Sequence, residues 1–269
     1  MNMISNRYRI RCLWPVALLS AAFVVLCASI PGAPAFARGP AAAGTPVLVE
    51  LFTSEGCSDC PPADDLLARL DREQFAPGVH AIVLSEHVTY WNHQGWEDPF
   101  SMQQVDYRQQ DYVQHFGLQS PYTPQMVVDG AQQFVGNNGP ALNLAMTKAV
   151  SDSKQPLDIV DAQWNKDGVH FGVHTSAAHG EHLFAALAQD VAPSKVSAGE
   201  NAGRTLNYVA VVRALKEYKS DFADGHPLAI SASEMKKDAA GSAVRLVVFL
   251  ADTHTGHVEA VAEQSLTKP

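Results

Sequence analysis

The chain has 269 residues, of which 46% are hydrophobic, so it can bury one large or two ordinary cores. Its formal net charge of −9 at pH 7 argues against nucleic acid or an anionic membrane surface as a partner. After the first 37 residues no stretch is apolar enough to span a bilayer, so we expect no stable membrane insertion of the mature chain.

Residues 1–37 have the pattern of a secretory signal peptide. Three arginines precede an apolar run over 13–30, and Ala35-Phe36-Ala37 is a small-residue cleavage site. We predict cleavage after Ala37 and export to the periplasm or the medium. An uncleaved anchor is the alternative, because the apolar run is long.

Cleavage would leave two cysteines, Cys57 and Cys60, in an oxidising compartment. They follow a nearly continuous apolar run over 47–52, typical of a buried strand, and a turn composition over 53–56. Apolar residues at helical spacing follow from Ala63 to Leu70. The pattern predicts a strand, a tight turn, Cys-x-x-Cys and a helix.

Cysteines in the first turn of a helix can bring their sulfurs together near unpaired N–H groups, which stabilise a thiolate. This favours a dithiol/disulfide redox site at Cys57 and Cys60. A static disulfide that pins the turn, or half of a metal site, are the alternatives. A structural zinc site of this type needs a second cysteine pair, and the mature chain has none.

Further elements follow up to residue 150. Apolar patterns predict a strand over 79–85, a helix that begins at Asp98 and ends by Gly117, and a strand over 126–128. Asp129-Gly130 predicts a hairpin to a short strand over 132–136, and a helix is expected over 138–150. This order is that of the thioredoxin fold with an inserted helix, and it places Pro124 as a cis-proline beside the cysteines.

Residues 151–156 form a polar linker, after which the pattern becomes β-rich. Strands are expected over 157–164, 169–175, 183–189, 228–233, 244–251 and 258–264, with residues 208–218 either strand or helix. We therefore predict a signal peptide over 1–37, an α/β thioredoxin-like domain with a helical insertion over 45–152, and a β-rich, sandwich-like C-terminal domain over 156–269.

Four stretches occur in a characteristic order: ELFTSEGCSDCPPAD, HVTYWNHQGWEDPF, YTPQMVVDG and GENAGRTLNYVAVVR. Together they resemble an exported bacterial family catalogued as domain of unknown function 1223. The resemblance covers nearly all of the mature chain and implies a thioredoxin-like portion followed by a β-rich portion. The family typically has Asp at the positions of Thr89 and Asn92.

The loop after the second strand supplies candidate substrate-binding residues. Tyr90, Trp91 and Trp96 could line the redox site, or they could fill space beneath the inserted helix. A cis-Pro124 would expose the backbone of Thr123 to an extended substrate. 

A soft metal such as Cu(I) is another possible ligand of this region. It could bind Cys57 and Cys60 together with His87 or His93, which would make the chain a copper-handling module.

Two other groups of residues are expected to be structural. The loop over 199–204 lacks the spacing of a phosphate-binding fingerprint, and we expect it to pack on the first domain through Glu200 and Arg204. Four histidines are expected at the surface: His170, His174, His179 and His182.

The leading hypothesis is an exported thiol–disulfide oxidoreductase without a cofactor. Cys57 would attack, Cys60 would resolve the mixed disulfide, and Pro124 would shape the groove for a protein thiol or disulfide partner. Because Glu55 and other carboxylates surround the cysteines, we expect only a moderately lowered pKa for the Cys57 thiol. The alternatives are the copper-handling module and an interaction protein with an inert disulfide.

Overall fold

The structure is a computed structural model that describes residues 44–176, 180–235 and 243–267. The predicted signal peptide, its cleavage site and His179 lie outside these residues. Within the described ranges, no helix is long and apolar enough to cross a membrane.

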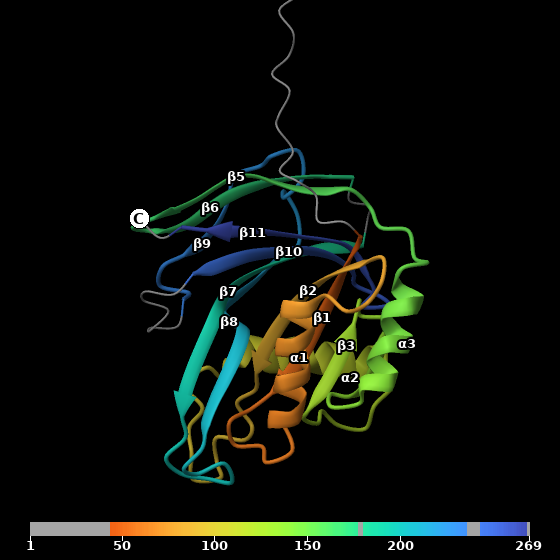
Figure 1. The fold of residues 1–269 in the computed structure, drawn as a ribbon. Coiled ribbons are helices and arrows are strands. Elements are labelled where there is room, and N and C mark those ends of the chain that lie inside the picture. The colour runs from red at the N-terminus through yellow and green to blue at the C-terminus, as the bar shows by residue number, and fades with distance from the viewer. Residues whose placement is uncertain (1–43, 177–179, 236–242, 268–269) are drawn as a thin grey trace, which may run out of the picture. The chain divides into compact units, whose positions relative to one another are not determined.

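The chain contains three helices and eleven strands in the described ranges (Figure 1). The helices are α1 (Pro61–Glu73), α2 (Gln103–His115) and α3 (Gly139–Ala149). The first strands are β1 (Thr45–Thr53), β2 (Val79–His87), β3 (Gln125–Val128), β4 (Gln132–Val135), β5 (Leu157–Asn165) and β6 (Gly168–Thr175). The remaining strands are β7 (Glu181–Lys195), β8 (Thr205–Tyr218), β9 (Leu228–Ser231), β10 (Val244–Asp252) and β11 (Val258–Leu266).

The sheet topology overturns the predicted fold class. Eight strands form one mixed sheet in the order β11-β10-β7-β8-β2-β1-β3-β4, so strands from both predicted halves share it. Only β5, β6 and β9 form a separate sheet. The prediction of an α/β thioredoxin-like domain with a helical insertion and a sandwich-like second domain is therefore wrong. The protein is predominantly β, with a large mixed sheet.

The local sequence pattern could not predict the shared eight-stranded sheet, because strand order depends on pairing between segments that are distant in sequence. β8 joins β2 through a short parallel contact, Ser85 opposite Val211, and neither strand signals this partner locally. The local elements themselves agree with the expected order. Residues 208–218 belong to β8, whereas the expected helix start at Asp98 is wrong because α2 begins only at Gln103.

Two apolar clusters occupy the two sides of β7. Leu183 and Leu187 pack with Phe171 of β6, so the three-stranded sheet covers this side. Phe184 lies on the other side, where the guanidinium of Arg108 from α2 stacks 4.7 Å from its ring centroid. The alternation of side chains along a strand places these contacts on opposite faces.

Helices α1 and α2 likewise lie on opposite faces of β1. Phe52 meets the ring of Tyr112 from α2 at a centroid distance of 5.9 Å. Its neighbour Leu51 points to the opposite face, where its side chain and Ala63 of α1 both lie against Gly136. The end of β1 is thus buried on both faces, which fixes the turn that carries the cysteines.

The far part of the β7–β8 hairpin leaves the large sheet. β10 pairs with β7 only up to Gln189, and β2 meets β8 only at Val211. Beyond these points β7 and β8 pair only with each other, from Val191 opposite Val209 to Lys195 opposite Thr205. Figure 1 shows the two strands running past the rest of the sheet. We call residues 190–210 the ribbon.

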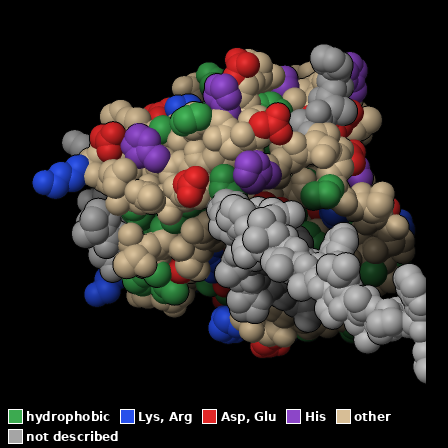
Figure 2. All heavy atoms as spheres, turned by 90° about the horizontal axis from the view of Figure 1, so that it is seen from above, with side chains coloured by type: hydrophobic (Ala, Val, Ile, Leu, Met, Phe, Trp, Pro, Cys, Tyr) green, Lys and Arg blue, Asp and Glu red, His purple; other side chains and the backbone are tan. Residues whose placement is uncertain are grey.

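Histidine and acidic side chains lie interspersed on the face seen from above (Figure 2). His170 lies 3.1 Å from Asp167, and His182 lies 2.5 Å from Glu217. His174 is exposed. His170 and His182 thus pair with nearby carboxylates, the three histidines reach the surface as expected, and they do not converge on one site.

Candidate functional site

The cysteine pair lies at the amino-terminal end of α1. β1 ends at Thr53, and the turn that follows delivers Cys57 and Cys60, whose sulfurs form a disulfide with the Cα atoms 5.4 Å apart. Cys60 is the N-cap of α1, and Pro61 occupies the first helical position, where no N–H is required. The predicted strand, turn, Cys-x-x-Cys and helix are confirmed.

Both cysteines are buried. Cys57 is 1% exposed and Cys60 is fully covered, whereas Ser58 and Asp59 between them are exposed. Part of the cover is the loop at the tip of the ribbon. The Asn201 amide nitrogen donates to the carbonyls of both Glu55 and Cys57 at 2.9 Å, and a Glu200 carboxylate oxygen accepts from the Ser58 N–H at 3.1 Å.

The 199–204 loop therefore packs on the cysteine turn, as expected from the sequence. Glu200 makes one of the predicted contacts, whereas Arg204 donates to Asn201 at 2.8 Å within the loop. Asn201, which makes the most contacts with the turn, was not singled out. A polar amide in a Gly-rich loop gives no sequence signal for this role.

On the other side of the turn, Trp91 connects the cysteine segment to the segment before β3. The Cβ that an alanine would have at Gly56 lies 3.0 Å from the Trp91 Cβ. The indole N–H donates to the Thr123 hydroxyl at 2.7 Å. The Thr123–Pro124 bond is cis, as predicted.

Gly136 allows Pro124 to approach α1. A Cβ on Gly136 would lie 2.8 Å from Leu51 Cδ1 and 3.0 Å from the Cβ atoms of both Ala63 and Pro124. A side chain at this position would have to displace the buried Leu51 side chain and press on Ala63 and Pro124.

We therefore expect Gly136→Ala to destabilise the protein by about 1–3 kcal/mol through overpacking. Urea unfolding measures the loss. Gly139→Ala is the matched control, because a Cβ there meets nothing within 4 Å. Equal effects of the two substitutions would contradict the packing explanation.

A buried ion pair between His87 and Asp98 contacts the cysteine turn. His87 Nδ1 lies 2.7 Å from Asp98 Oδ2, and the same oxygen accepts from the Glu55 N–H at 2.8 Å. Burial alone would lower the pKa of His87, but the Asp98 carboxylate outweighs it and raises the pKa. Burial alone would raise the pKa of Asp98, but the paired His87 lowers it. Asp98 thus fixes both β2 and the cysteine turn.

Further titratable side chains lie around this pair. Burial, with the nearby Asp98 charge, raises the pKa of Glu55. Burial raises the pKa of Asp64 in α1 to about 7, although the charge of His87 and the Thr53 hydroxyl oppose this shift. Tyr208 of the ribbon packs on the His87 ring at a centroid distance of 4.6 Å, and burial raises its pKa. A buried, mostly acidic cluster therefore lies next to the disulfide.

Glu55 and Asp64 were expected among the carboxylates near Cys57, and the structure places both beside the turn. The roles of Asp98 and Tyr208 were not predicted, because Asp98 resembled a helix cap. The Asp64 side chain is buried, and its carboxylate lies near His87 of β2 and Tyr208 of the ribbon, which no local pattern brings to it.

Two further residues predicted to bind substrate, Trp96 and Tyr90, make hydrogen bonds within the protein. The Trp96 indole N–H donates to Glu55 at 2.6 Å, and its Cβ abuts Gly199. Tyr90 donates to Gln109 of α2 at 3.2 Å. Trp96 thus supports the cysteine turn through Glu55, whereas Tyr90 contacts α2.

The predicted metal ligands do not converge. Among the described residues, no group of three or more His, Cys, Asp or Glu side chains is placed to hold a metal ion. His87 is engaged by Asp98, His93 is exposed, and the cysteines form a disulfide. This arrangement does not support the copper alternative.

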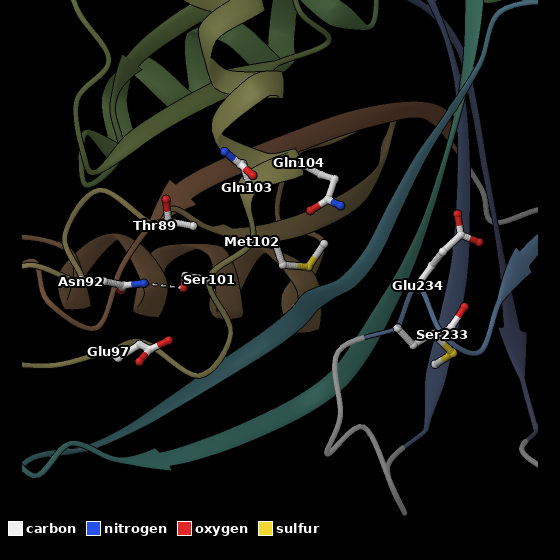
Figure 3. Close-up of a pocket in the computed structure, with 10 residues that line it drawn as sticks. Thr89, Asn92, Glu97, Ser101, Met102, Gln103, Gln104, Ser233 and Glu234 are labelled. Carbon is white, nitrogen blue, oxygen red and sulfur yellow. Dashed lines mark hydrogen bonds between the residues drawn. The ribbon is translucent and has the colours of Figure 1, made fainter.

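A separate pocket of about 370 Å³ lies beside the loop after β2 (Figure 3). It is lined in part by Thr89, Asn92 and Glu97, with Glu234 on the opposite side. Asn92 donates to Ser101 at 3.0 Å, as the dashed line shows. The cysteines do not line this polar pocket.

Comparison with known proteins identifies the family. The model of a family described as protein of unknown function (DUF1223) matches residues 48–251. The chain belongs to this family. No curated protein matches it.

One solved structure is similar, that of protein AGR_C_4864 from Agrobacterium tumefaciens. It is 21% identical, the match covers 85% of this chain and 97% of that chain, and the TM-score is 0.57. At this identity the likeness concerns the fold alone.

Proposed function

We propose that this member of the family is an exported thiol–disulfide oxidoreductase that exchanges electrons with a protein thiol or disulfide. The observation that carries the proposal is the Cys57–Cys60 disulfide at the amino-terminal end of α1. These are the only cysteines in the described residues, so the pair has no partner for exchange within that part of the chain. The helix terminus favours the thiolate that each exchange step requires.

In the proposed reaction, the thiolate of reduced Cys57 attacks a disulfide of the partner. A mixed disulfide forms and one partner sulfur leaves as a thiolate. The Cys60 thiolate then attacks Cys57, which releases the second partner sulfur and restores the Cys57–Cys60 disulfide. The partner gains two electrons and the cysteine pair loses two. Trp91 and Thr123, which flank the turn, would contact the partner chain.

Trapping of the mixed disulfide tests this proposal. Cys60→Ala leaves Cys57 without a resolving thiol, so the proposal predicts covalent adducts with periplasmic proteins that dithiothreitol releases. The matched control is Cys57→Ala, which retains only the resolving cysteine and should form far fewer adducts. Equal, low levels of adducts in both variants would contradict the assignment.

The burial of both sulfurs favours one competing function, an interaction protein with an inert disulfide. Under that alternative, a Cys57→Ser/Cys60→Ser protein would fold and retain its biological role. Loss of that role in a folded double variant would support the oxidoreductase.

A further inference from the structure

The burial of the disulfide sets a requirement for any exchange. An external thiolate must approach a sulfur directly, in line with the S–S bond. Cys57 is 1% exposed and Cys60 is 0% exposed, so neither sulfur is open to such an approach. Some covering element has to move before exchange can begin.

The ribbon is the covering element that the contacts identify. Its tip reaches the cysteine turn through three hydrogen bonds, two from Asn201 to the Glu55 and Cys57 carbonyls and one from Ser58 N–H to Glu200. Each bond ends on the backbone of the turn, beside or within the Cys-x-x-Cys segment.

The tip is a preformed unit. Val196 and Arg204 close it through a backbone hydrogen bond of 3.0 Å. Arg204 also donates to the Asn201 side-chain oxygen, which turns the amide nitrogen toward the two carbonyls. Gly199 has φ +76° and packs against Trp96, in a conformation that a larger residue would adopt only with strain. The tip can therefore release the turn without itself unfolding.

The base of the ribbon has the features of a hinge. The pairing of β7 with β8 shifts register between Leu187 and Ala188, and Ala210 has φ +47°. Beyond this point the ribbon is two-stranded, and its Leu206 and Tyr208 pack with Phe100 in a small apolar cluster. Two-stranded segments outside a larger sheet belong to the less stable parts of a fold.

We infer that the ribbon controls access to Cys57–Cys60, with Asn201 and Glu200 as positioning residues that hold it closed. This inference rests on the proposed function, because the ribbon would control access for the proposed thiol–disulfide exchange. In the open state one external thiolate attacks the disulfide, forms a mixed disulfide and releases the other cysteine as a thiolate. A second external thiolate completes the reduction and leaves as an external disulfide, so two electrons enter the pair.

The rate of reduction tests this inference. The oxidised mature chain, which begins after the predicted cleavage site, is mixed with excess dithiothreitol or glutathione, and the appearance of free thiols gives the rate constant. Asn201→Ala removes two hydrogen bonds of the closed state and should accelerate reduction about tenfold. Glu200→Ala removes one bond from an exposed side chain and should accelerate it about threefold.

Three controls separate access from general weakening. Asn207→Ala changes an exposed asparagine of β8 on the same ribbon and should leave the rate unchanged. Leu246→Ala creates a cavity in the apolar cluster that contains Leu183 and Phe171. It should lower the stability of the protein without a comparable acceleration of disulfide reduction. The equilibrium constant with glutathione should be the same in Asn201→Ala and wild type, because access changes the forward and reverse rates equally.

Unchanged rates in both Asn201→Ala and Glu200→Ala would overturn the inference. So would an acceleration in Leu246→Ala as large as in Asn201→Ala, because opening would then be global. The rate comparison does not depend on the potential of the couple. A strongly reducing wild-type couple would thus refute the proposed function, whereas the order of the rates would still decide the role of the ribbon.

Discussion

Replacement of Arg108 by Met is expected to cost about 3–5 kcal/mol of folding free energy. Arg108 is 4% exposed, and its guanidinium donates to Glu50 from Nε at 2.9 Å and from a terminal nitrogen at 3.2 Å. It also contacts the Tyr112 hydroxyl and stacks on Phe184. The variant would leave the Glu50 carboxylate buried without its counterion.

Urea unfolding near pH 7 measures this loss. The second substitution Glu50→Gln should recover part of it, because it removes the uncompensated charge. Arg69→Met is the matched control: Arg69 is exposed on α1 and stacks on Phe75, so we expect a loss of at most about 1 kcal/mol. A loss of less than about 1 kcal/mol in Arg108→Met would contradict the buried-pair account.

Asp64→Asn is expected to make the protein more stable at pH 8 and to have little effect near pH 4. The pKa of Asp64 rises from 3.8 to about 7 because burial disfavours the carboxylate. The folded state therefore holds a proton that the unfolded state has lost between these pH values, and stability falls as the pH rises through them. The cost above pH 7 corresponds to about 4 kcal/mol, and this sets the upper limit of the gain.

Unfolding free energies of the wild type and Asp64→Asn at several values of pH test this expectation. The difference between the two proteins should grow from about pH 4 to pH 7 and then level off. Asp65→Asn is the control, since Asp65 is the adjacent, exposed residue of the same helix. A difference that does not change with pH would show that Asp64 is charged, or solvated, in the folded protein.

The sequence was sufficient for the local parts of the site. The apolar run before Thr53, the Cys-x-x-Cys spacing and Pro61 specify the strand, turn and helix without help from distant residues. These features depend on residues close together in sequence, where propensity and spacing carry information. The cis bond before Pro124 was predicted instead from its position in the expected thioredoxin-like order, and the bond is cis although that fold class is wrong.

The fold class and the cover of the site were not predictable in this way. They depend on the pairing of β8 with β2 and on the contact of Asn201 with Cys57, which are separated by more than 100 residues. The length of β7, Glu181–Lys195, was underestimated because the pattern ended at Gln189, where the ribbon leaves the sheet. Strands outside a large sheet lack the long apolar runs by which buried strands are recognised.

The reduction potential of the Cys57–Cys60 pair tests the central claim most directly. The oxidised mature protein is equilibrated with glutathione buffers, and the free thiols are trapped and counted. The proposed function predicts a potential within the range of known exchange proteins. It should lie above about −270 mV and below about −120 mV, the value of the most oxidising of these proteins. A value below about −300 mV would identify a structural disulfide and would contradict the oxidoreductase.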